Sequence, residues 1–155
     1  MKKYLLIDVN NVIHKSPRLK SLFSKDKKHA ILSFIEKVKT QFGRNFRIEF
    51  YLDGHGETTA NNIFYSMSRT ADELIRKRIE DSNNHRNLTV VSSDSYITGL
   101  AKACGCEVKS SEEFLKLTEE NVFKDKNINH VLESESEKPK SVSRKDLDYY
   151  KNLFS

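Results

Sequence analysis

Short apolar runs alternate with amphipathic segments along most of this chain, and that alternation restricts it to few architectures. The apolar runs have the length of strands and cover residues 3–8, 46–52, 63–67, 88–92 and 106–108. Apolar residues recur at helical spacing between them, over about 27–42, over 70–83, around Ile97 to Ala101 and over 110–123. Strands that alternate with helices are typical of a mainly parallel sheet between two helical layers. We therefore expect an α/β fold, a three-layer sandwich.

Local signals mark several ends of these elements. Gly43 follows the first helical stretch and suits the C-terminal cap of that helix. Thr70 and Glu73 match a capping box, in which Thr70 caps a helix and Glu73 reaches back to it. Between the first strand and the first helix, residues around Pro17 suggest a loop.

The length of 155 residues suits one main domain. Residues 133–142 are polar and poor in apolar side chains, as in linkers. We expect a domain over residues 1–125, a polar linker over 126–142 and a helical segment over 143–155. The helical segment carries an apolar stripe that should dock on this domain or on a partner. The stripe consists of Leu147, Tyr150, Leu153 and Phe154.

Carboxylates stand where such a fold places functional groups. Asp8 closes the first strand, Asp94 follows the strand at 88–92, and Asp72 lies at the start of a helix. Ligands of open α/β sheets bind beyond the carboxyl ends of the strands. Carboxylates gathered there would repel each other by about 4 kcal/mol per pair at ~4 Å. A hard divalent cation relieves that cost, because it binds oxygen ligands.

Each carboxylate also has a structural interpretation. For Asp94, a role as a turn residue or as the N-cap of the next helix explains its position as well as ion binding does. Asp72 would favour the helix dipole, or pair with Arg76 one turn later. For Asp8 this interpretation is weaker, since a charge directly behind four apolar residues is costly unless it is paired.

The net charge of +5 is unevenly distributed. Residues 1–80 carry 16 Lys and Arg against 9 Asp and Glu, which gives +7, and residues 81–155 carry 11 against 13, which gives −2. A basic half beside an acidic pocket fits a polyanion held next to a metal. The alternative for Lys25, Lys27 and Lys28 is a solubilising surface.

The N-terminal apolar run ends at Asp8 after four residues, too early for a secretory signal or a membrane span. We therefore expect a cytoplasmic protein with no membrane association. Cys104 and Cys106 provide too few ligands for a zinc site, and we expect buried, reduced thiols at the start of a strand.

Four motifs resemble those of the YacP-like NYN domains, a branch of the PIN-like nucleases. They are LLIDVNNVI at residues 5–13, FYLDGH at 50–55, TADELI at 70–75 and VVSSD at 90–94. They occur in the family's order across about residues 3–122. The chain departs from the first motif at Val9, where the family usually has Gly, and at Asn10, where it usually has Tyr. These departures concern substrate contacts near residue 10.

The resemblance implies a PIN-like, Rossmann-like fold. It further implies a metal-dependent endoribonuclease that cleaves single-stranded RNA by attack of metal-activated water, in RNA decay or processing. By carry-over, Asp8, Asp72 and Asp94 bind Mg²⁺ or Mn²⁺, partly through water. Asn11 orients Asp8 or the scissile phosphate as an amide donor. The expected substrate is single-stranded RNA such as mRNA, with a ribosome as a further candidate partner and no small-molecule cofactor.

Two further residues take supporting roles by the same resemblance. Ser93 would support Asp94. Asp53 is either an outer-shell carboxylate or only a turn residue before Gly54.

RNA contacts are expected from basic and aromatic side chains near the carboxylates. Arg69 and Arg76 flank Asp72, and guanidinium groups bind phosphate in bidentate fashion, although a solvated helix face explains them as well. His55 is a candidate substrate contact or an ordinary loop residue. A base could stack on His55, Tyr65 or Tyr96.

The chief alternative is an RNA- or ribosome-binding module that keeps the fold without catalysis. A haloacid-type phosphatase is disfavoured because Asp8-Val9-Asn10 lacks a second carboxylate. A receiver domain is disfavoured because no acidic pair accompanies Lys109, and no glycine-rich nucleotide-binding motif occurs.

Overall fold

The computed structural model describes residues 2–56 and 62–119. Residues 1–115 form one compact unit, and residues 116–119 belong to a second. The proposed linker over 126–142 and the C-terminal segment over 143–155 lie outside the described residues. The expected domain boundaries and the docking of the C-terminal stripe therefore stay predictions.

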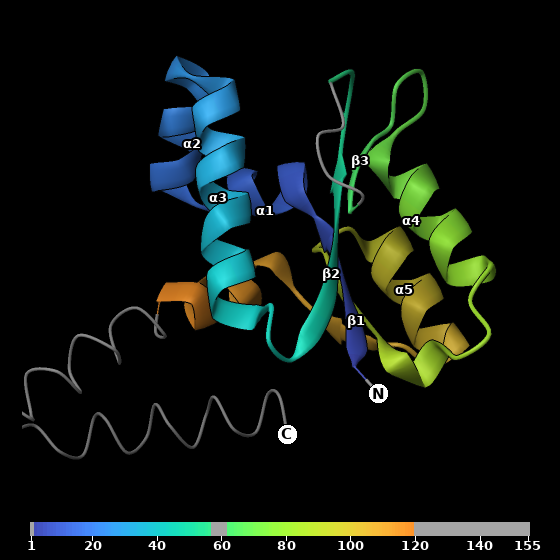
Figure 1. The fold of residues 1–155 in the computed structure, drawn as a ribbon. Coiled ribbons are helices and arrows are strands. Elements are labelled where there is room, and N and C mark those ends of the chain that lie inside the picture. Colours follow the sequence, from blue (N-terminus) through green and yellow to red (C-terminus); the bar gives the residue numbers. More distant parts are fainter. Residues whose placement is uncertain (1, 57–61, 120–155) are drawn as a thin grey trace, which may run out of the picture. The chain divides into compact units, whose positions relative to one another are not determined.

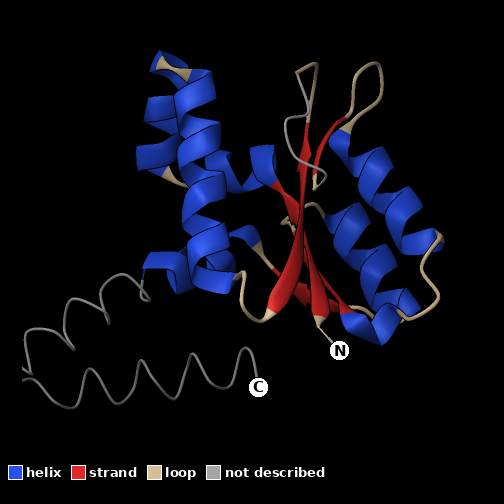
Figure 2. Ribbon diagram, viewed as in Figure 1, coloured by secondary structure: helices blue, strands red, loops and turns tan. Residues whose placement is uncertain are grey.

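A five-stranded parallel sheet forms the centre of the first unit (Figure 2). Its strands are β1 (Lys3–Asp8), β2 (Phe46–Leu52), β3 (Ile63–Tyr65), β4 (Leu88–Val91) and β5 (Glu107–Lys109). Their order is β3-β2-β1-β4-β5, so β1 is the middle strand. Leu6 pairs with Glu49 of β2 on one side and with Val90 of β4 on the other. All carboxyl ends therefore meet at one edge, as the sequence predicts.

Helices cover both faces of this sheet, which confirms the three-layer sandwich (Figure 1). α4 (Ala71–Glu80) and α5 (Ser95–Cys104) lie on one face, and α1 (Val9–His14), α2 (Pro17–Lys25) and α3 (Lys27–Phe42) lie on the other. The short 3₁₀ helix η1 (His85–Asn87) precedes β4. A further helix begins at residue 111 and continues to 119.

The buried core follows the alternation of the strands. On the face of α4 and α5, one cluster joins Leu6, Val90, Ile75, Ile79 and Ile97. On the other face, the Phe114 ring lies 5.3 Å from Phe42 and 6.5 Å from Phe34, measured between ring centroids.

A partly buried charged network holds α4 against the sheet. The Arg78 guanidinium on α4 contacts both carboxylate oxygens of Glu49 on β2, at 2.8 and 3.3 Å. The Tyr51 hydroxyl donates to the same carboxylate at 2.6 Å, and Arg78 lies 5.1 Å from the centroid of the Tyr4 ring. Bidentate pairing fixes orientation as well as distance, so this network helps to hold the last turn of α4 against the sheet.

The predicted loop around Pro17 is wrong, because α1 and α2 occupy that region. α1 follows β1 directly, and Asp8 at its N-cap makes no side-chain capping hydrogen bond. α2 has conventional signals: the Ser16 side chain accepts the Leu19 N–H at 3.2 Å, and Pro17 occupies the first turn. Proline is favoured there because its missing N–H has no intrahelical partner in any case.

Smaller differences concern ends of elements. The third strand ends at Tyr65 rather than at Met67, whose φ of 59° leaves the strand conformation. Cys106 is buried just before β5, where burial raises the pKa of its thiol to about 11, while Cys104 at the end of α5 is half-buried. Across residues 2–56 and 62–119, no helix combines the length and apolarity that a bilayer crossing requires.

Candidate active site

The carboxyl edge of the sheet collects acidic side chains from four places in the chain. Asp8 ends β1, Asp53 follows β2, Asp72 lies in the first turn of α4, and Asp94 is the N-cap of α5. Both helices begin at this edge, so their positive dipole ends face it. The topology therefore brings together the three carboxylates expected from the sequence, with Asp53 as a fourth.

Asp8 is the most deeply placed of these groups, with a relative exposure of 6%. The pKa of its carboxyl group is raised to about 6, chiefly by burial, with smaller contributions from the negative charges of Asp53 and Asp72. A hydrogen bond of 3.0 Å from the Ser92 hydroxyl opposes this shift. The ionised form of Asp8 is therefore costly unless positive charge accompanies it.

Asp72 is the second carboxylate with a raised pKa. Partial burial is the main cause, and the charges of Asp94 and Asp53 add to it, whereas Arg76 lowers it. Asp8 and Asp94 are thus both within electrostatic range of Asp72, and Asp53 is within range of Asp8 and Asp72. Such mutual repulsion is what a bound cation would relieve.

These groups do not form a closed metal cage. Within the part of the chain that the structure describes, no three His, Cys, Asp or Glu side chains lie close enough to bind one ion together. Mg²⁺ usually keeps several of its waters and contacts only one or two carboxylates directly. The arrangement fits a hydrated ion of that kind, with the other carboxylates acting through water.

Asp94 uses one carboxylate oxygen as a helix cap. Its Oδ1 accepts the backbone N–H groups of Tyr96 and Ile97, at 2.9 and 3.1 Å. The interpretation of Asp94 as an N-cap is therefore correct. The charge of Asp94 still acts on Asp72, so capping and ion binding are compatible roles for one carboxylate.

Asp53 is more than a turn residue before Gly54. Its Oδ1 accepts the Ala71 N–H at 2.7 Å, at the first residue of α4, and its own N–H donates to Asn10 Oδ1 at 2.9 Å. Asp53 thereby ties the end of β2 to α1 and to α4. Asn10, which departs from the family pattern, holds the backbone of Asp53 in place, and the sequence motif gave no sign of that role.

Asn11 and two serines connect the loops of the site. Asn11 Oδ1 accepts the Ser93 N–H at 3.0 Å and the Ser111 hydroxyl at 2.6 Å. Among the hydrogen bonds of the described residues, Asn11 therefore uses its carbonyl oxygen rather than its amide donor. The Ser93 hydroxyl donates to Glu112 and accepts the Ser111 N–H at 2.9 Å.

The support expected from Ser93 for Asp94 comes instead from Ser92. The Ser92 hydroxyl donates to Asp8 and accepts the Asp94 N–H at 3.1 Å, so one buried side chain links the carboxylate of Asp8 to the backbone of Asp94. Its position directly after β4, in register with Asp8, is the signal that could have identified it.

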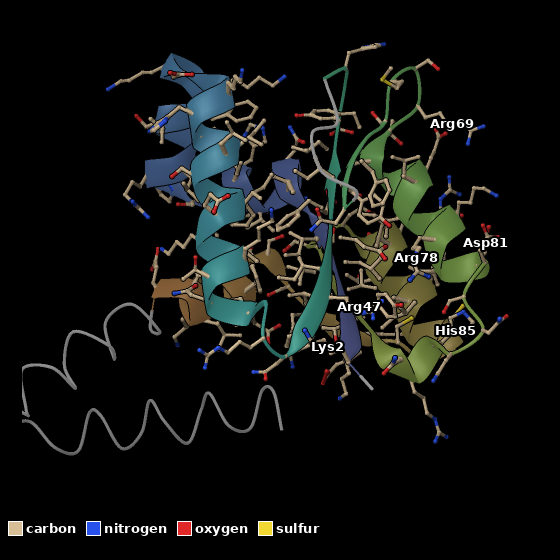
Figure 3. The ribbon with its side chains drawn as sticks, viewed as in Figure 1. Lys2, Arg47, Arg69, Arg78, Asp81 and His85 are labelled. Carbon is tan, nitrogen blue, oxygen red and sulfur yellow. The ribbon has the colours of Figure 1, made fainter. Side chains whose placement is uncertain are left out.

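The residues expected to contact RNA lie in different parts of the structure. Arg76 lies at the site, because its charge acts on Asp72 and its guanidinium packs 5.0 Å from the centroid of the Tyr96 ring. Arg69 is exposed on the loop that leads into α4 (Figure 3). His55 lines a cavity of about 580 Å³ between α3 and β3, together with Lys27 and Tyr65.

The family model of the YacP-like NYN domain matches residues 5–154. The chain belongs to the YacP-like NYN domain family. Family membership confirms the resemblance seen in the motifs and indicates a PIN-like, nuclease-type domain, with RNA as the suggested substrate. No curated protein sequence matches the chain.

Two solved structures show the same fold as this YacP-like NYN domain. Both are crystal structures of Rae1 (YacP) from Bacillus subtilis, one of them a point mutant. The mutant has a TM-score of 0.68 at 23% identity, covering 99% of this chain and 98% of that one. The other has a TM-score of 0.64 at 24% identity, covering 96% and 92%.

Proposed function

We propose that this YacP-like NYN domain is an endoribonuclease that cleaves single-stranded RNA, such as mRNA, with the help of Mg²⁺ or Mn²⁺. The observation that supports it most directly is the charge repulsion among carboxylates at one sheet edge, between Asp8 and both Asp53 and Asp72, and between Asp72 and both Asp53 and Asp94. Their repulsion costs stability, and a bound cation would relieve that cost. A purely RNA-binding module would gain no affinity for RNA from their charges, since RNA is itself an anion.

Each residue has a defined task in this proposal. Asp8, Asp72 and Asp94 would hold the ion, partly through water, with Asp53 in the outer shell. When bound, the ion activates water and neutralises charge on the scissile phosphate. Ser92 fixes Asp8 through its hydroxyl. Arg76, beside Asp72, is suited to a phosphate oxygen, and the N-termini of α4 and α5 favour an anion between them.

The proposal is tested by RNA cleavage with matched variants of one helix. Wild-type protein should cleave mixed single-stranded RNA with Mn²⁺ or Mg²⁺ and stop when EDTA is added. Water attack leaves 5′-phosphate and 3′-hydroxyl ends, which a 5′-phosphate-dependent exonuclease detects. Asp72→Asn should lower the rate by about 100-fold or more, because a metal contributes several kcal/mol to the transition state.

Asp81→Asn provides the control. Asp81 is an exposed residue at the end of the same helix and pairs with Lys77 at 3.3 Å, so its substitution removes the same charge away from the site (Figure 3). It should cleave as the wild type does. Unchanged cleavage by folded Asp72→Asn would refute the metal-site assignment. RNA binding without any cleavage by the wild type would favour the non-catalytic module.

A further inference from the structure

Tyr96 exposes a large aromatic ring beside the carboxylates. It lies in the first turn of α5, two residues after Asp94, and 62% of its surface is accessible. Its backbone N–H is bound by the Asp94 carboxylate at 2.9 Å. The carboxylate of Asp94, a proposed ion ligand, is therefore fixed to the backbone of Tyr96.

Arg76 reaches the same ring from α4. Its guanidinium carbon lies 5.0 Å from the ring centroid, and Nη1 donates to the Tyr96 hydroxyl at 3.4 Å. Arg76 Nε is buried without a hydrogen-bond partner in the described residues. An arginine near an aromatic ring holds that ring in place. Tyr96 is thus pre-organised, so a ligand that used its ring would lose little additional side-chain entropy.

The other rings considered from the sequence are placed differently. Tyr65 packs so closely on the backbone of Gly56 that a Cβ added there would lie 2.4 Å from its ring. His55 shares the cavity between α3 and β3 with Tyr65. Neither is hydrogen-bonded to a site carboxylate or to Arg76 in the described residues, whereas Tyr96 is linked to both.

We propose that Tyr96 is a stacking platform for an unpaired RNA base next to the scissile phosphate, and that Arg76 holds the ring in position. This inference rests on the proposed function, because it takes RNA as the substrate. An aromatic face accepts any base but only one that has left its duplex. The platform therefore selects single strands over duplexes, with little preference for sequence.

The test measures binding of a short single-stranded RNA in which one nucleotide at a time is abasic. The full chain carries Asp8→Asn to suppress cleavage. One abasic position should weaken binding by about tenfold, and Tyr96→Ala should weaken binding of intact RNA by a similar factor. The two losses should not add, because both remove the same stack. Tyr96→Phe should bind within about twofold of its parent, since the stacking ring remains.

Phe23→Ala is the matched control, because Phe23 also packs near a cation, with Lys27 Nζ at 5.6 Å from its ring, but on the opposite face of the sheet. It should not change the abasic profile. Additive losses for Tyr96→Ala and every abasic position would overturn the platform, as would a Tyr96→Phe defect as large as that of Tyr96→Ala. Tyr96→Leu replaces Tyr96→Ala if thermal melting shows that the alanine variant is unfolded.

The outcome for the platform is separable from that for catalysis. If wild-type protein binds RNA with this coupling but never cleaves it, the nuclease proposal fails and the platform stands. If the wild type cleaves but no coupling is found, the platform fails and the nuclease proposal stands.

Discussion

At the scale of single residues, Asp8 links stability to pH. Burial raises the pKa of its carboxyl group from 3.8 to about 6. Between these values the folded protein binds more protons at Asp8 than the unfolded chain does, so stability falls as pH rises through this window. Below it both states are protonated and the penalty disappears. Above about pH 6 the penalty is complete, at about 3 kcal/mol.

Asp8→Asn should therefore stabilise the metal-free protein at neutral pH. In EDTA at about pH 7.5, we expect its free energy of unfolding in urea to exceed that of the wild type by up to about 3 kcal/mol. The difference should shrink towards zero near pH 4. A difference that does not change between these pH values would show that Asp8 is not the group responsible.

At the scale of elements, Asp94 caps α5 and is also a proposed ligand of the ion. Asn caps helices about as well as Asp does, whereas Ala does not. Asp94→Asn should therefore keep the stability of the wild type within about 0.5 kcal/mol and lose cleavage. Asp94→Ala should lose cleavage and also about 1 kcal/mol of stability. Urea unfolding and RNA cleavage of both variants separate the two roles, and active Asp94→Asn would leave only the cap.

The elements also show how far the sequence could predict the structure. The strands and long helices were predictable, because their apolar spacing is a local signal. The carboxyl edge of the parallel sheet then brings Asp8, Asp72 and Asp94 together. α1 was not, because it has only six residues and no capping side chain. The supporting hydrogen bonds were not predictable either. The bond between Asn11 and Ser111 joins residues 100 positions apart, and no local pattern reports such a pair, while Ser92 could be matched to Asp8, 84 positions away, only once the register of β1 and β4 was known.

At the scale of the whole molecule, a divalent ion should stabilise the fold. A ligand that binds only the folded state adds about 2.7 kcal/mol at a concentration of 100 times its Kd, which corresponds to several degrees in the melting temperature of a domain of this size. We expect this rise for wild-type protein in millimolar Mg²⁺ or Mn²⁺, relative to NaCl of equal ionic strength. Asp8→Asn should lose most of it. A wild-type melting temperature indifferent to both ions would contradict an ion site.

The central position of β1 has a consequence for the time at which activity can arise. β1 is synthesised first, yet one of its two neighbours in the sheet, β4, begins only at Leu88. Ser92 must also be present before it can hold Asp8, 84 positions earlier in the chain. At about 5–20 residues per second, synthesis leaves roughly 4 to 17 seconds between the two. During that interval the proposed nuclease lacks its site, and the growing chain stays inactive towards the message from which it is made.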